Sequence, residues 1–187
     1  MLVRVPKTFN EATTLISVGN VLKCSFESNL EYKLEYTSTS GYRSGLPIIG
    51  DEIRYKPIRQ SHWVLMGKNW IRKIESIDFC KDEFKGYHIP KVLDAILCLF
   101  AYFLKHHKNV LPDNPKRRLM TCQEQYGTTP VILGAFNPNG LYININRHHL
   151  DNVGFILSKS LPETEEEEDE MTRLLGTHRR IAATPSF

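Results

Sequence analysis

The most uniformly apolar stretch of the chain runs from Val92 to Leu104 and reads VLDAILCLFAYFL, with Asp94 as its one charged residue. A helix that is apolar on every side is normally buried, because none of its faces favours water. As a helix this stretch spans about 20 Å, which is too short to cross a bilayer. We therefore expect a central core helix over about residues 90–108, beginning near Pro90 and ending at the basic Lys105–Lys108. The alternative is a helix that buries itself in a partner subunit or inserts shallowly into a membrane.

Two elements are expected before residue 40. Thr8 to Glu11 has the spacing of a capping box, which predicts a short helix from Phe9 to about Ile16. Residues 22–36 then alternate, with apolar side chains at even positions and polar ones at odd positions over most of the stretch. Because one strand of that length is unusual, the pattern predicts a hairpin that turns at Ser28–Leu30. One face of this hairpin would be buried and the other charged.

Further strands are expected on both sides of the central helix. Residues 70–80 fit either a helix or a strand, and the preceding Gly67-Lys68-Asn69 turn favours a strand. Strands before and after one helix predict an α+β fold, in which two strand groups of a mostly antiparallel sheet pack on that helix. The other expected strands are a short one around Ile53 and Tyr55, Trp63–Met66, Leu119–Gln125, Pro130–Ala135, Leu141–Asn146 and Val153–Leu157.

The end of the chain differs from the rest in charge. Residues 161–187 hold seven acidic and three basic side chains, a formal charge of −4, whereas residues 1–160 hold 14 acidic and 21 basic ones, a formal charge of +7. Ser160 to Glu163 again has capping-box spacing, so the tail is expected to be either an exposed acidic helix or a disordered segment. We therefore predict one globular domain over residues 1–160 and an acidic C-terminal helix or tail over residues 161–187.

The spacing of the cysteines and the hydropathy of the chain indicate the cellular compartment of the protein. The four cysteines, Cys24, Cys80, Cys98 and Cys122, are widely spaced, which favours reduced thiols over a disulfide framework. The first residues lack the apolar core of a signal peptide, and no segment is long enough to span a bilayer. We expect an intracellular protein, cytoplasmic or nuclear and not secreted.

Known catalytic and metal-binding motifs give little support for an enzyme. The chain has no phosphate-binding glycine loop, no Cys-x-x-Cys pair and no His-Glu-x-x-His. The adjacent pairs His106-His107 and His148-His149 point in different directions on a helix or strand, so neither pair chelates a metal well. Cys122 with His148 or His149 is the most plausible nucleophilic pair, but free cysteine is more often a small core residue. We expect a non-catalytic protein without a metal or cofactor.

Basic residues interleaved with aromatic ones supply the strongest functional signal. Such a pattern is typical of surfaces that bind phosphates and stack bases. We therefore expect an anionic partner, with nucleic acid preferred over an anionic membrane surface or an acidic protein, and we expect the acidic tail to fold back on the basic face. The alternatives are a self-associating, matrix-like structural protein that bridges a membrane and a nucleoprotein, and a Cys/His hydrolase. The candidate binding residues are Arg54, Lys56, Arg59, Trp63, Lys68, Trp70, Arg72, Lys73, Lys116, Arg117, Arg118 and Arg147.

Overall fold

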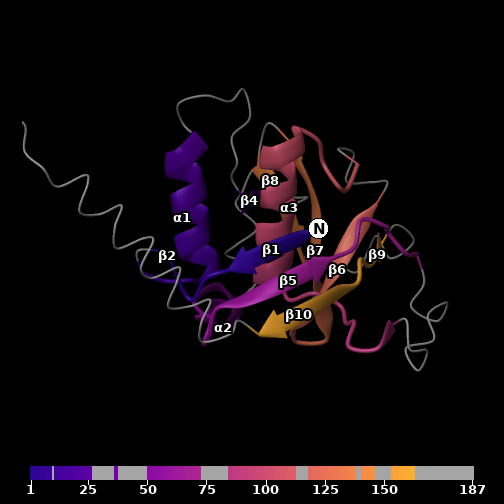
Figure 1. Ribbon diagram of the computed structural model, residues 1–187, viewed down its shortest axis with the longest axis horizontal. Coiled ribbons are helices and arrows are strands. Elements are labelled where there is room, and N and C mark those ends of the chain that lie inside the picture. Colours follow the sequence, from indigo (N-terminus) through magenta and orange to yellow (C-terminus); the bar gives the residue numbers. More distant parts are fainter. Residues whose placement is uncertain are drawn as a thin grey trace, which may run out of the picture.

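A computed structural model shows strands arranged in sheets around a long central helix (Figure 1). Its described residues form three sheets, and the central helix is largely buried. The structure describes residues 1–9, 11–26, 36–37, 50–72, 84–112, 118–137, 140–145 and 153–162. In chain order the elements are β1 (Leu2–Val5), β2 (Thr8–Phe9), β3 (Glu11–Ala12), α1 (Leu15–Phe26), β4 (Tyr36–Thr37), α2 (Asp51–Arg54), β5 (His62–Met66), α3 (Val92–His106), β6 (Leu119–Tyr126), β7 (Thr129–Asn137), β8 (Gly140–Asn144), β9 (Val153–Gly154) and β10 (Ser158–Pro162).

The two larger sheets have mostly antiparallel pairing. The first has the order β1-β5-β10, and both of its strand pairs are antiparallel. The second has the order β4-β8-β7-β6-β9, in which the central pairs are antiparallel and the short edge strands β4 and β9 pair in parallel. Strands β2 and β3 form a separate small ribbon. This arrangement confirms the predicted α+β class.

Helix α3 packs against both larger sheets, with contacts to β1 and β5 of one sheet and to β6 and β7 of the other (Figure 1). Every residue from Val92 to Phe100 is buried, including Asp94. Each fully buried large apolar side chain contributes about 1.5–3 kcal/mol to folding. The buried surface therefore extends around the helix from Val92 to Phe100, as the sequence predicts, whereas Leu104 near the end of the helix is 44% exposed. Helix α3 is the core on which the two strand groups pack.

The N-terminal part of the chain departs from the sequence-based expectation. The predicted capping box at Thr8 to Glu11 is wrong, because β2 and β3 pair there instead. The reciprocal cap lies six residues further along, where the Thr14 amide donates to Ser17 Oγ at 2.9 Å and the Ser17 amide donates to Thr14 Oγ1 at 3.1 Å. This cap starts α1, which continues to Phe26 and so replaces the first strand of the predicted hairpin. Most of the second hairpin strand lies outside the described residues.

Two other local predictions, the strand around Ile53 and Tyr55 and the capping box at Ser160, are also wrong. The segment around Ile53 is a short helix, α2, whose first turn carries Asp51 and Glu52, where acidic side chains favour the helix dipole. The chain from Ser158 to Pro162 is a strand paired with β5, so Ser160 does not cap a helix, and the acidic helix or tail expected beyond it stays a prediction. Residues 163–187 lie outside the described part of the chain.

The remaining strand predictions have mixed outcomes. Strands β5, β6, β7 and β8 confirm four of the expected strands with small shifts of their ends. The predicted strand over Val153–Leu157 is shorter, because β9 ends at Gly154 and Phe155 only bridges Ile71. That bridge is the described part of the strand expected over residues 70–80.

Candidate functional site

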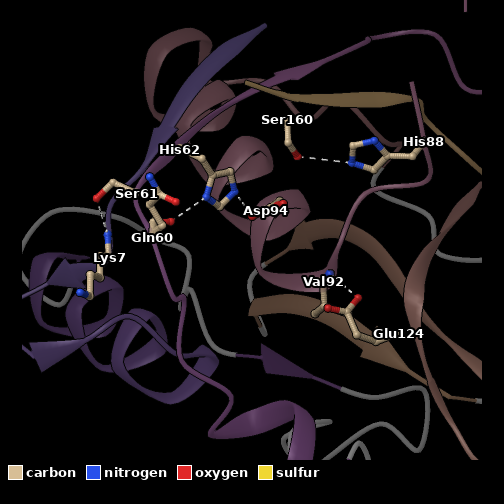
Figure 2. Close-up of polar contacts among 9 residues, drawn as sticks. All are labelled: Lys7, Gln60, Ser61, His62, His88, Val92, Asp94, Glu124 and Ser160. Carbon is tan, nitrogen blue, oxygen red and sulfur yellow. Dashed lines mark hydrogen bonds and ion pairs between the residues drawn. The ribbon is translucent and has the colours of Figure 1, made fainter. Parts of the chain in front are cut away.

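A cleft of about 900 Å³ opens beside the first turn of α3. Its walls come from the segment that follows α2, from Lys91 to Asp94 at the start of α3, and from Gln123-Glu124 of β6. Cavities that bind small molecules commonly have about 300–1,000 Å³. The polar contacts that shape this cleft are drawn in Figure 2.

The central polar contact joins β5 to α3. His62, the first residue of β5, places Nε2 at 3.0 Å from Asp94 Oδ1 in the first turn of α3 (Figure 2). The Asp94 side chain is 3% exposed and the His62 side chain is 18% exposed. A buried carboxylate costs several kcal/mol unless it is paired. The pair therefore explains how one charged residue can lie inside an otherwise apolar helix.

Both ring nitrogens of His62 face hydrogen-bond acceptors. Nδ1 lies 3.1 Å from the Gln60 carbonyl oxygen, and Nε2 faces the Asp94 carboxylate. A neutral imidazole can donate from only one nitrogen, whereas an imidazolium donates from both. The hydrogen bond to Asp94 raises the pKa of His62, against the opposing effects of burial and of the positive charge on Lys91. The geometry thus favours a protonated His62 whose two donors are already engaged.

Glu124 caps the start of α3 from the neighbouring sheet. The Val92 amide donates to Glu124 Oε2 at 2.8 Å (Figure 2). Lys91, the N-cap residue of α3, makes no side-chain capping hydrogen bond in the described structure. Burial raises the pKa of Glu124, with a further contribution from the negative charge of Asp94, while the Val92 hydrogen bond opposes the shift. Two carboxylates therefore lie close enough to influence each other at the inner part of the cleft.

Three cations surround these carboxylates. Lys56, Arg59 and Lys91 line the cleft, and all three are exposed. The positive charge of Lys56 lowers the pKa of Glu124 and that of Lys91 lowers the pKa of His62, so both lysines lie near the inner groups. If the protonated His62 and Asp94 are counted as a neutral pair, the three cations and Glu124 leave a formal charge of +2 in the cleft.

The structure brings together only some of the residues predicted from the sequence. Lys56 and Arg59 line the cleft. Arg54 on α2 instead pairs with Asp51 and lies 5.5 Å from the Tyr55 ring. Trp63 neighbours His62 but points to the opposite face of its strand, where it lies across from Arg4 on β1 and Leu161 on β10.

Another group of predicted residues lies at the far end of β5 and beyond. Arg118 lies 5.5 Å from the ring of Trp70, whose indole nitrogen donates to the Leu119 carbonyl at 2.9 Å. Lys68 lies 5.2 Å from the ring of Tyr102 on α3. Arg72 is exposed. Of the remaining predicted residues, Lys73, Lys116, Arg117 and Arg147 lie outside the described part of the chain.

Sequence reasoning missed four members of the cleft as site residues: His62, Lys91, Asp94 and Glu124. Asp94 carried a usable signal, since a lone charge within an apolar helix requires a partner. Its partner is a histidine 32 residues away. Nothing in the sequence around Glu124 or Lys91 distinguishes these residues from ordinary surface charges.

The described structure gives no support for the thiol and metal alternatives. Cys122 is buried in the core, and burial raises its pKa well above the usual value, which disfavours the reactive thiolate. Burial likewise raises the pKa of Cys98 to about 12. His148 and His149 lie outside the described residues, and the described residues contain no cluster of side chains suited to a metal ion.

Comparisons with known proteins identify no relative of this chain. No protein-family model, no curated protein and no solved structure matches this chain. Among the helices of the described ranges, none has both the length and the hydropathy that a bilayer-spanning segment requires.

Proposed function

We propose that this protein binds single-stranded nucleic acid, and that the phosphates of the strand lie along Lys56, Arg59 and Lys91. The observation that carries the proposal is that these three exposed cations line one cleft of nucleotide-compatible volume. Contacts to phosphates supply most of the sequence-independent affinity for nucleic acid. The cleft therefore combines an anionic subsite with a concave space.

A single strand fits this arrangement better than a duplex. The inner wall of the cleft includes Leu15, Ile53 and Leu93, which are buried apolar residues. An unpaired base can turn away from its backbone and insert its flat aromatic ring into such a space, whereas a base in a duplex cannot do so without leaving its stack. The protein acts in this proposal as a binding protein, without a catalytic step.

The test compares two triple variants with the same loss of charge. The first, Lys56→Ala/Arg59→Ala/Lys91→Ala, removes the cations of the cleft. The control, Lys85→Ala/Lys105→Ala/Lys108→Ala, removes three exposed lysines elsewhere in the chain. Both should fold, because every substituted side chain is exposed. Fluorescence anisotropy with a labelled single-stranded oligonucleotide would then be measured across a salt series.

The cleft variant should bind more weakly than the control at low salt. If its three cations each neutralise one phosphate, the slope of log K against log salt should fall by about 2, because each contact to a single strand contributes about 0.7. Equal losses in the two variants would show that binding depends on net charge alone. Absence of binding by the unmodified protein at low salt would disprove the proposal.

A further inference from the structure

The charged groups of the cleft are arranged by depth. The cations Lys56, Arg59 and Lys91 are exposed, whereas Glu124 is only partly exposed and Asp94 is 2% exposed. A ligand that enters this cleft therefore meets positive charge first and carboxylates further in. This order decides which part of a nucleotide can enter.

The inner end repels phosphate. The start of a helix often binds anions through its free amide groups. Here Glu124 already accepts the Val92 amide at 2.8 Å, and its carboxylate places negative charge at this position. A phosphate group would have to displace that contact and approach the negative charge of Glu124. The anionic part of a ligand therefore belongs at the outer cations, and the part that enters must be uncharged or cationic.

Hydrogen-bond acceptors remain at the inner end. Of the polar atoms in the described structure, Asp94 Oδ2 is one of the few that is buried without a hydrogen-bond partner. Its other oxygen is held by His62. A carboxylate offers about four lone-pair positions, so Glu124 keeps acceptor capacity beside the single bond from Val92. The inner end of the cleft is thus rich in acceptors, and both donors of His62 are engaged.

We propose that Glu124, which lies in the same cleft as the unpartnered Oδ2 of the more deeply buried Asp94, selects nucleotides whose bases carry an exocyclic amino group. This inference rests on the proposed function, because it assumes that a base enters the cleft while its phosphate stays at the cations. A carboxylate accepts hydrogen bonds from the amino group of cytosine. Uracil has a carbonyl oxygen at that position, which a carboxylate repels. Glu124 is then the specificity-determining residue of the cleft.

The test uses oligocytidylate and oligouridylate of equal length, which have the same charge and the same ring size. The unmodified protein should bind oligocytidylate about 5-fold more tightly or better, the lower limit for a good base contact. The substitution Glu124→Gln keeps the shape and an oxygen acceptor but removes the negative charge. In this variant the ratio of the affinity for oligocytidylate to that for oligouridylate should fall close to one. The affinity for oligouridylate itself should be unchanged or higher. The control Glu52→Gln, at an exposed position on α2, should keep the preference.

A second measurement avoids any question of folding. Cytidine and uridine monophosphates would compete with the labelled oligonucleotide for the unmodified protein, and cytidine monophosphate should compete at about 5-fold lower concentration. Equal, salt-dependent binding of the two oligonucleotides would overturn the assignment of Glu124 and leave the proposed function intact. A preference that survives Glu124→Gln would also overturn it. Failure of both oligonucleotides to bind would overturn this inference together with the proposed function.

Discussion

Removal of His62 tests whether its pair with Asp94 holds β5 against α3. The substitution His62→Ala leaves Asp94 buried with neither carboxylate oxygen partnered among the described groups. A hydrogen bond to a charged group contributes about 1.5–3 kcal/mol to stability. Because the His62 side chain is 18% exposed, we expect His62→Ala to lower the free energy of unfolding by a value within that range, about 2 kcal/mol. The free energy of unfolding would be measured by urea denaturation followed by circular dichroism.

The pH dependence of this loss has a definite sign. The pKa of His62 in the folded protein is raised above its usual value of 6.5. A raised pKa means that the folded state binds the proton more tightly, so the extra stability is fully present below about pH 6.5 and is lost as the pH rises through the folded-state pKa. The difference between the unmodified protein and His62→Ala should therefore be larger at about pH 5.5 than at about pH 8.5. It should not vanish at high pH, because a neutral imidazole can still donate one hydrogen bond to Asp94.

His88 provides a matched control, because its ring contacts the exposed Ser160 hydroxyl at 3.4 Å rather than a buried carboxylate. We expect His88→Ala to reduce the free energy of unfolding by less than about 0.5 kcal/mol, as is usual for surface substitutions that leave no buried charge unpaired. The reasoning about His62 would be refuted if His62→Ala matched this small loss, or if its destabilisation increased with pH. A double-mutant cycle with Asp94→Ala should give a coupling of about 2 kcal/mol between the two side chains.

Three further predictions concern packing, the thiols and the tail. Gly154→Ala should destabilise the fold by about 2–3 kcal/mol in urea denaturation, because a Cβ there would meet a backbone carbonyl and a tryptophan ring. The control Gly127→Ala should cost about 1 kcal/mol, because its Cβ would lie in open space but its φ is +61°. Equal losses of stability in the two variants would contradict this packing. Cys98 and Cys122 should react with a thiol reagent only on unfolding, because burial raises the pKa of both thiols. Peptide mass spectrometry would follow the labelling, and rapid labelling of native Cys122 would contradict its position in the core. Truncation after Pro162 should raise affinity for nucleic acid most at low salt if the acidic tail competes for the cations, and an unchanged affinity and salt slope would remove that idea.

The fold was predictable where one pattern extended over a long segment. The apolar stretch around α3 has no polar face, which indicated burial between layers, and the structure buries it from Val92 to Phe100. The prediction from alternating side chains was wrong where a local helix cap favoured another structure. The alternation at Leu22, Cys24 and Phe26 fitted a strand, but the reciprocal Thr14–Ser17 cap starts a helix that runs through these residues. The cap satisfies the first amide groups of the helix, and an alternating pattern of side chains takes no account of that local contact.

The candidate site was less predictable, because its members come from three separate segments that only tertiary packing brings together. Asp94 was the one sequence signal, since a carboxylate inside an apolar helix must find a donor. The chain offers 24 lysines and arginines and seven histidines, and helical spacing alone does not choose among them. The choice of His62 depends on the register that places the first residue of β5 beside the first turn of α3. A charge near the end of a buried helix therefore predicts a contact between elements. Here that contact forms one wall of a cleft, because strand β5 and helix α3 both begin at this point and their polar ends need access to solvent or to a ligand.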